Sequence, residues 1–238
     1  FFTIVQMAVL FALSLLVYAL PRLRPARAVL SMTSMFNNCG NYGIPLVIFA
    51  FPDNPELLGP LAVIIAMQNL ANFTFGIWLF ERRKHGTINV LKGFVGVPVV
   101  YALIAAIVMR LFNIEPLPQI AKPIGFLSDG LVAIALITLG AQLSRSLSIS
   151  DPLPLAIVTL MRLVISPLLT AAMIPLFGFD LRSPLAAMII VIAGMPVAVN
   201  VYILAAEYKR DEALASQAIF WTTLLSPITL AILLSLCR

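Results

Sequence analysis

The chain has 238 residues, of which 61% are hydrophobic and only 11% are charged, and its formal net charge is +5. A soluble globular domain is roughly 45–50% apolar and about 25% charged, so this composition excludes a surface solvated by water and requires lipid as the solvent. The positive charge does not indicate nucleic-acid binding, because the basic residues lie in short connectors between apolar runs rather than in one patch.

Eight apolar runs follow one another along the chain, and each is long enough to cross a bilayer as a helix. The strands of a membrane barrel would alternate apolar and polar residues, whereas these runs are continuous. The sequence therefore predicts an all-α integral membrane protein with eight spans. The runs cover residues 1–20, 28–50, 57–80, 93–112, 124–143, 153–177, 184–206 and 213–236.

The Lys and Arg residues of alternate connectors predict the orientation of the spans. One side holds ten of them and the other side holds four, so the first side is expected in the cytoplasm and the protein in the cytoplasmic (inner) membrane of a bacterium. The first group is Arg22, Arg24, Arg27, Arg82, Arg83, Lys84, Lys92, Arg145, Lys209 and Arg210, and the second is Arg110, Lys122, Arg182 and Arg238.

Helix-breaking residues interrupt the second and seventh runs. Residues 37–45 read Asn-Asn-Cys-Gly-Asn-Tyr-Gly-Ile-Pro, and residues 194–200 read Gly-Met-Pro-Val-Ala-Val-Asn. Pro and Gly both disfavour a continuous helix, and a broken backbone at membrane depth needs partners from protein or from a watery cavity. We expect two broken crossover helices that line such a cavity. For either one alone, a harmless kink is the alternative.

The two interruptions coincide when the sequence is shifted by 156 residues, which carries residues 28–80 onto 184–236 and Ile44 onto Asn200. The shift moves the chain by five runs, an odd number, so the second copy is inverted. Inverted repeats with facing broken helices are a layout of secondary transporters. The fourth and fifth runs lack partners in the first copy, which predicts a ten-span parent with roughly 55–65 further residues before Phe1, from the repeat offset and the length of a span.

The breaks carry the chemistry that we expect at the site. Half-helix ends inside a membrane attract ions, anions at the N-terminus and cations at the C-terminus. Asn38, Asn41 and Asn200 add neutral amides, which can hold a carboxylate without burying a fixed charge. This combination predicts a site for a small organic anion. The alternative is that these amides only cap the broken helix ends.

Three further amides lie in the third run. Gln68 and Asn72 share one helix face, with Asn69 beside them. Amides that face lipid would be costly, so this face is expected to turn inward. Substrate contact and hydrogen bonding between helices are both open interpretations.

Asp129 and Arg162 are the charged residues that fall most clearly within spans. Ionisable residues inside a membrane are candidates for coupling or gating. Their expected depths differ by about 10 Å, estimated at 1.5 Å per helical residue, so a direct pair is not expected. For Asp129, the alternative is a place near the outer interface.

Metal, cofactor and enzyme signatures are not found in the sequence. Cys39, Cys237 and His85 are scattered rather than clustered, so no metal site is expected. The sequence has no Walker A loop and no HExxH helix. We therefore expect neither an enzyme nor a cofactor.

Several of these segments resemble the auxin efflux carrier family, which includes bacterial permeases described as malonate carriers and the plant auxin carriers. Residues 38–45, with Asn ahead of Gly-Ile-Pro, resemble the fourth helix of the family, and residues 194–196 with 205–208 resemble the ninth. Shorter matches are residues 80–82, 127–129 and 162–167. The resemblance covers the family's helices three to ten.

The resemblance implies a ten-helix fold of two inverted five-helix repeats, related to the bile-acid sodium symporters. It implies that residues 1–80 and 153–237 form a transport domain, which slides in an elevator-type cycle against a scaffold that includes residues 90–146. The scaffold helices are the expected contact of a homodimer.

The resemblance also implies a substrate site at the crossing of the broken helices, with Asn38 as the best candidate for a carboxylate contact. Asn200 lies near the facing crossover. Gly43, Pro45 and Pro196 belong to the same two segments, as does Asn41. The plant carriers have a Pro where Val201 stands and an apolar residue in place of Asn200, which disfavours auxin itself.

The resulting hypothesis is a secondary transporter of small organic anions, such as malonate-like or auxin-like carboxylates. One alternative is a sodium-coupled symporter of the bile-acid type, which would show acidic and hydroxyl clusters near the crossing. Another is a membrane sensor that keeps the fold without transport, which would carry a fused soluble domain.

Overall fold

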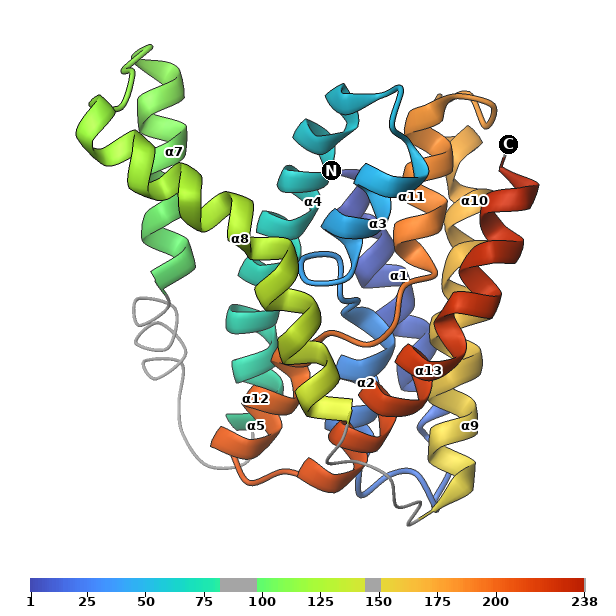
Figure 1. The fold of residues 1–238 in the computed structure, drawn as a ribbon. Helices are drawn as coiled ribbons and strands as arrows, with labels where there is room; N and C mark the ends of the chain where they lie inside the picture. Colours follow the sequence, from blue (N-terminus) through green and yellow to red (C-terminus); the bar gives the residue numbers. More distant parts are fainter. Residues whose placement is uncertain (82–97, 144–150, 238) are drawn as a thin grey trace.

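A bundle of apolar helices forms the part of the chain that the computed structural model describes, residues 1–81, 98–143 and 151–237. The described residues contain no β-strand, which confirms the predicted all-α class. Figure 1 shows the helices running roughly along one common direction, with two thin extended links crossing near the middle of the bundle. The candidate site lies at these links.

The first half of the bundle comes from residues 1–81. A long helix leads into two short helices with a gap between them, and a third, interrupted span follows. In chain order the elements are α1 (Phe2–Val17), α2 (Arg27–Met35), α3 (Gly43–Ala50), the short turn η1 (Pro55–Leu57), α4 (Leu58–Ala71), the π-helical turn η2 (Asn72–Gly76) and α5 (Ile77–Glu81).

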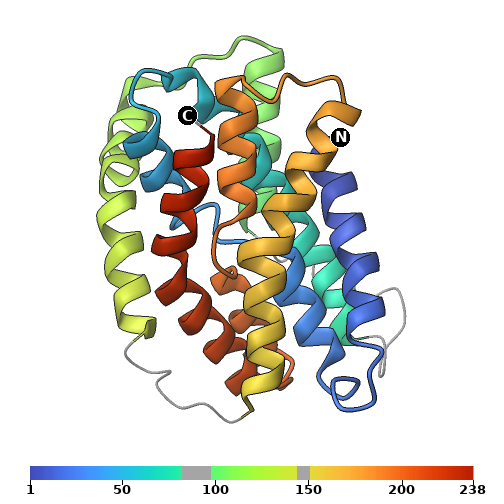
Figure 2. The same cartoon turned by 90° about the vertical axis from the view of Figure 1, so that its right-hand side faces the viewer.

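The second half comes from residues 151–237. It has the same order of elements: a long span, then two short helices with a gap between them, then another long span. In the sequence, α7 (Pro98–Leu111) and α8 (Pro118–Leu143) come between the two halves. The later elements are α9 (Pro152–Leu160), the π-helical turn η3 (Met161–Ile165), α10 (Ser166–Leu176), α11 (Pro184–Ala193), α12 (Val199–Glu207) and α13 (Glu212–Leu236). Figure 2 shows α1, α10, α11 and α13 side by side across one face.

Local capping explains where α9 and α11 begin. The Asp151 carboxylate accepts a hydrogen bond from the N–H of Leu153 at 3.2 Å, and the Ser183 hydroxyl accepts one from the N–H of Ala186 at 3.2 Å. Each cap is followed by a proline in the first turn, where no N–H is needed. The connectors predicted at these points therefore end where the sequence places a cap.

Three helices in the described residues are long and apolar enough to cross a membrane: Pro55–Phe80, Pro152–Leu176 and Glu212–Leu236. The helices Phe2–Val17 and Pro184–Ala193 are apolar but shorter. The divided second and seventh runs fall below this length because their helices stop at the interruptions. The number of eight spans stays a prediction.

Hydrogen bonds between side chains join neighbouring helices inside the bundle. The Tyr18 and Ser34 hydroxyls lie 2.7 Å apart between α1 and α2, and the Gln6 amide donates to the Thr170 hydroxyl at 2.6 Å between α1 and α10. All four residues are buried. Such bonds fix how helices pack where lipid provides no hydrophobic driving force between them.

The helices α7 and α8 lie at the side of the bundle, where α7 contacts α4 and α8 contacts α13 (Figure 1). Their described side chains include many exposed apolar groups, which suits a surface in lipid. Examples are Tyr101, Ile104, Phe126, Ile134 and Ile137. The homodimer expected through these helices stays a prediction.

Candidate functional site: a polar cavity at the crossing of two divided helices

The two interruptions predicted from the sequence lie against each other. The chain is extended at Phe36, after α2, and Asn37 pairs with Val197 as a single antiparallel bridge. The Asn38 N–H donates to the Pro196 carbonyl at 2.8 Å, and the Ala198 N–H donates to the Phe36 carbonyl at 3.0 Å. These two bonds satisfy backbone groups that the broken helices would otherwise leave unpaired at membrane depth.

A tight turn restarts the chain as α3 after the first interruption. The carbonyl of Asn38 accepts hydrogen bonds from the N–H groups of Tyr42 and Gly43, at 3.2 and 3.1 Å. Pro45 lies in the first turn of α3, where a missing N–H is tolerated. A Cβ on Gly43 would lie 3.0 Å from the Met195 sulfur, so glycine allows the two interruptions to approach closely.

Side chains from the neighbouring long helices hold both extended links. The Gln68 side-chain oxygen, on α4, accepts from the Asn37 N–H at 3.2 Å. The Thr222 hydroxyl, on α13, accepts from the Val197 N–H at 3.1 Å. Each link thus has one support from the long helix that follows it in the chain, which leaves neither central N–H unpaired.

Arg162 lies behind the crossing and is fully buried. Its guanidinium donates to the carbonyls of Ser34, Ala193 and Met195 at 2.7, 2.5 and 3.1 Å, and to the Ser166 hydroxyl at 2.8 Å. Ser34 lies in the last turn of α2 and Ala193 ends α11, so the positive charge lies at two helix C-termini, which are the negative ends of helix dipoles.

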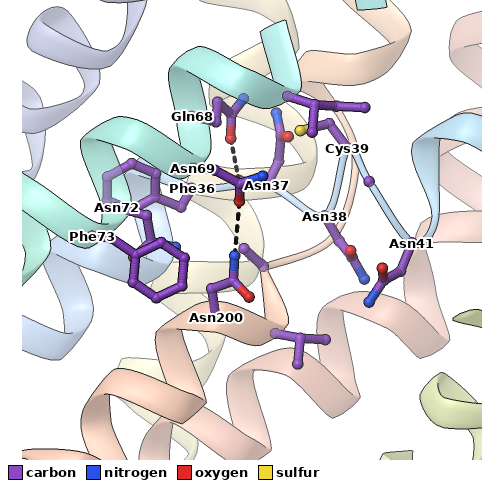
Figure 3. Close-up of a pocket in the computed structure, with 14 residues that line it drawn as sticks. Phe36, Asn37, Asn38, Cys39, Asn41, Gln68, Asn69, Asn72, Phe73 and Asn200 are labelled. Atoms are coloured by element: carbon purple, nitrogen blue, oxygen red, sulfur yellow. Dashed lines mark hydrogen bonds between the residues drawn. The ribbon is translucent and has the colours of Figure 1, made fainter. Parts of the chain in front are cut away.

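A cavity of about 380 Å³ opens beside the crossing (Figure 3). No charged side chain is found among its described lining residues, half of which carry side-chain amides beside apolar and aromatic neighbours. They are Phe36, Asn37, Asn38, Cys39, Gly40, Asn41, Ile65, Gln68, Asn69, Asn72, Phe73, Ala198, Val199 and Asn200. The cavity therefore offers neutral donors and acceptors to a ligand.

Some of these amides are already paired. The Asn200 amide nitrogen donates to the Asn69 oxygen at 2.9 Å, which joins α12 to α4, and the Asn37 amide nitrogen donates to the Ile192 carbonyl at 3.0 Å. Figure 3 shows the Asn69–Asn200 pair on one side of the cavity, with Asn38 and Asn41 on the other. The paired amides keep the shape of the cavity.

Other amide atoms at the cavity have no partner among the described residues. They are the side-chain nitrogen of Asn38 (Nδ2) and the side-chain oxygens of Asn37 and Asn72 (Oδ1), and each is buried. Buried polar atoms are rarely left unpaired, because the lost hydrogen bond costs free energy. One open donor and two open acceptors are thus available to a polar ligand.

Two helix N-termini also face the cavity. Gly40 and Asn41, which precede α3, line it, and so do Ala198 and Val199 at the start of α12. A helix N-terminus carries free N–H groups and roughly half a positive charge. The cavity is therefore electrically suited to an anion although no charged side chain among the described lining residues contributes.

The structure gathers six of the site residues predicted from the sequence around this cavity: Asn38, Asn41, Gln68, Asn69, Asn72 and Asn200. Gly43, Pro45 and Pro196 shape the crossing instead of lining the cavity, and Arg162 lies behind it. Asp129 falls within α8, but its side chain lies outside the described residues.

Sequence reasoning missed four lining residues with side chains of interest: Phe36, Asn37, Cys39 and Phe73. Asn37 is the first residue of the polar segment 37–45, so its position in that segment could have identified it. Phe73 lies four residues after Asn69, on the helix face that also carries Gln68 and Asn72, so helical spacing was the available signal for it.

Residues 1–234 match the family of proteins described as "Membrane transport protein". The chain belongs to this family, which is that of the auxin efflux carriers. It is also 25% identical over 245 aligned positions to a protein of Rhizobium meliloti (strain 1021) named "Putative malonate transporter", and the alignment covers 99% of this chain and 74% of that protein. Both findings confirm the family suggested by the sequence motifs.

Membership in this family and the similarity to a transporter support a permease, a membrane protein that moves a small molecule across the bilayer. The apolar helices agree with a chain that crosses the membrane several times.

Proposed function

We propose that this chain transports a small organic anion of the malonate type, bound at the cavity beside the crossing. The observation that carries the proposal is an unpaired donor, the side-chain nitrogen (Nδ2) of Asn38, in a cavity faced by the N-termini of α3 and α12. A carboxylate accepts hydrogen bonds from such donors, and its charge is stabilised by the two helix dipoles.

The charge of Arg162 strengthens the preference for an anion. The guanidinium neutralises the C-terminal ends of α2 and α11, which leaves the positive N-terminal ends of α3 and α12 without a matching negative end nearby. Among the described residues, the single ion pair joins Arg22 to Asp151, so no described carboxylate balances Arg162. An anion in the cavity supplies the missing charge.

The size and the open acceptors favour a dicarboxylic acid with few carbons. A volume of about 380 Å³ lies at the lower end of the 300–1,000 Å³ typical of small-molecule sites. The unpaired side-chain oxygens of Asn37 and Asn72 can accept a hydrogen bond from the O–H of a second, protonated carboxyl group. The transporter named for malonate, 25% identical to this chain, is consistent with such a substrate.

Arg162 also favours transport without a bound sodium ion. Sodium at the crossing would need oxygen ligands from the helix C-termini, and three carbonyls of this region already accept from Arg162. We therefore prefer an anion carrier to a sodium-coupled symporter.

The proposal also places the protein in the inner membrane and includes an elevator-type movement. In that movement, a transport domain of residues 1–80 and 153–237 slides against a scaffold that includes residues 90–146. The 156-residue shift supports the pairing of the two transport regions, because it carries Gly43, the first residue of α3, onto Val199, the first residue of α12.

Counterflow into proteoliposomes tests this function, because exchange of labelled for unlabelled substrate needs no assumption about coupling. Vesicles loaded with unlabelled malonate are expected to accumulate labelled malonate, with succinate competing and indole-3-acetate competing weakly. Accumulation is expected to be the same in sodium and in potassium buffers.

An accumulation that requires sodium would contradict the sodium-free form of the proposal. Competition by neutral amides as strong as that by dicarboxylates would contradict an anion site. Empty vesicles and vesicles loaded with an unrelated sugar serve as the matched controls for leakage and for binding to lipid.

A further inference from the structure

A second polar cavity, of about 490 Å³, lies away from the crossing and shares no lining residue with the cavity there. It is lined by Arg24, Arg27 and Arg210, together with the aromatic side chains of Trp78 and Phe80. We call it the arginine pocket. The three arginines come from two segments, the α1–α2 connector with the start of α2 and the turn between α12 and α13.

The arginine pocket lies at one end of the bundle. The α1–α2 connector, α5 and the α12–α13 turn meet at the lower end in Figure 1. This is the end that the distribution of Lys and Arg predicts to be cytoplasmic. Phospholipid headgroups lie at this depth, beside the ends of the spans.

Backbone carbonyls hold two of the three guanidinium groups in place. Arg27 donates to the Leu15 carbonyl at 3.1 Å, and Arg210 donates to the Phe80 carbonyl at 3.2 Å. The Nε of Arg27 is buried and donates to no described partner. Each bond uses only one of the five N–H groups of a guanidinium, so the remaining donors are available to a ligand.

The described wall of the arginine pocket contains no acidic side chain. The ion pair found among the described residues, between Arg22 and Asp151, involves none of its arginines. Three positive charges around one cavity repel each other, and this repulsion is relieved when an anion binds among them. Phosphate suits the geometry, because guanidinium groups bind its oxygens through paired hydrogen bonds.

The rest of the wall is apolar, which a small hydrophilic anion would not need. Phe11, Leu15, Trp78 and Leu79 line the pocket beside the arginines. A ligand with a phosphate and a hydrocarbon part satisfies both kinds of surface. Basic pockets between spans on the cytoplasmic side are known to bind anionic lipid headgroups.

We propose that the arginine pocket binds the phosphate of an anionic phospholipid, whose acyl chain lies against Phe11 and Trp78. The bound lipid joins the start of α2 to the turn that follows α12. It therefore ties together the cytoplasmic halves of both divided helices.

Fluorescence quenching tests this proposal directly, because the chain has only two tryptophans. In a Trp221→Phe variant the emission comes from Trp78, which lines the arginine pocket. Phosphatidylglycerol with brominated acyl chains is added to the protein in nanodiscs of unlabelled phosphatidylcholine. Quenching is expected at a mole fraction at least fivefold lower than for brominated phosphatidylcholine.

Substitutions separate the arginine pocket from a general preference for anionic lipid. Arg27→Gln with Arg210→Gln is expected to remove the difference between the two lipids. Arg24→Gln, at an exposed position, is expected to reduce it without disturbing the fold. Arg22→Gln is the matched control, because Arg22 lies in the same connector and pairs with Asp151 outside the pocket, and it is expected to change nothing.

Equal quenching by the two lipids would overturn the proposal, and so would a preference that survives both the double and the single pocket variant. A last arm distinguishes a lipid from a free phosphate compound. Glycerol phosphate at millimolar concentration is expected not to displace the brominated phosphatidylglycerol, and its displacement of the lipid would overturn the assignment to a lipid.

Discussion

Asn38 combines two properties at the residue scale that rarely occur together. Its side chain is buried, with 5% of its surface exposed, and its amide nitrogen donates to no described partner. Its backbone is fully used, because its N–H donates across the crossing and its carbonyl begins the turn into α3. The side chain is therefore fixed in position while its donor stays open, which is what a selective binding group needs.

Replacing Asn38 by Ala is expected to weaken malonate binding more than it weakens the fold. A hydrogen bond to a charged group contributes about 1.5–3 kcal/mol, which corresponds to roughly 10- to 150-fold in the dissociation constant. Asn38→Asp is expected to abolish binding, because a second negative charge would face the carboxylate. Isothermal titration of the purified protein measures both.

The control for Asn38→Ala is Asn54→Ala, since Asn54 lies in the connector after α3 and, among the described residues, its side chain bonds to Glu56 alone, at 3.0 Å. Asn54→Ala is expected to leave malonate affinity unchanged. If Asn38→Ala bound malonate as tightly as the Asn54→Ala control, Asn38 would not contact the substrate.

Arg162 is expected to matter for stability as well as for charge. Arg162→Gln leaves several of its acceptors unpaired inside the bundle, and each buried unpaired group costs about 1–3 kcal/mol. Arg22→Gln removes an exposed ion pair, which contributes about 0–1 kcal/mol. We expect a large drop in the thermal midpoint for Arg162→Gln and almost none for Arg22→Gln, measured by fluorescence in detergent. Similar midpoints would contradict the structural role of Arg162.

At the scale of elements, the packing of η2 against the divided helices sets the position of the cavity wall. Gly76, the last residue of η2, is buried, and a Cβ there would lie 2.5 Å from the Met32 Cε on α2 and 3.2 Å from the Leu204 Cδ1 on α12. The same turn begins with Asn72, which lines the cavity. A shift of η2 away from α2 and α12 therefore moves a cavity residue.

Gly76→Ala and Gly59→Ala form a matched pair in the same predicted span. A Cβ at Gly59, in α4, meets nothing within 4 Å, so alanine is expected to be neutral or to stabilise the helix by up to about 1 kcal/mol. Alanine at Gly76 meets the flexible end of the buried Met32 side chain, which must shift, so this variant is expected to be less stable than Gly59→Ala by about 1 kcal/mol. Unfolding in urea–detergent mixtures measures the difference. Equal stabilities for the two variants would refute the close packing of η2.

At the scale of the whole molecule, the four half-helices meet near the middle of the bundle, with α2 and α12 at one end and α3 and α11 at the other (Figure 1). The cavity at their meeting point thus lies between the two ends of the bundle. Transport requires that it open to each side in turn. The proposed elevator movement of residues 1–80 and 153–237 against 90–146 would carry the cavity with the half-helices.

A cysteine at the cavity tests alternating access. The chain has two cysteines, so Cys39→Ala and Cys237→Ala give a background in which Asn41→Cys is the single thiol. A charged, impermeant thiol reagent is expected to label this cysteine from both sides of a vesicle membrane, and malonate is expected to slow labelling. Labelling from one side only, in all substrate conditions, would contradict alternating access. A cysteine at Asn54, in a connector, provides the single-sided control.

Local sequence features predicted a large part of the cavity. The spacing of Gln68, Asn69 and Asn72 places three amides on one side of a helix, and all three line the cavity. Asn38 and Asn200 were found because Asn, Gly and Pro break a helix wherever they cluster. Phe73 lies on the same helical face, four residues after Asn69, but its apolar side chain did not distinguish it from the other apolar residues of the span.

The sequence by itself determined that this protein is an α-helical membrane protein and where its helices stop. Both properties depend on local free energies, the cost of exposing apolar side chains to water and the cost of Gly and Pro within a helix. Only the tertiary structure decided that Asn37 pairs with Val197 and that Arg162 binds the ends of α2 and α11. Those contacts join residues far apart in the chain, and a hydrogen bond forms only where the fold brings donor and acceptor within about 3 Å.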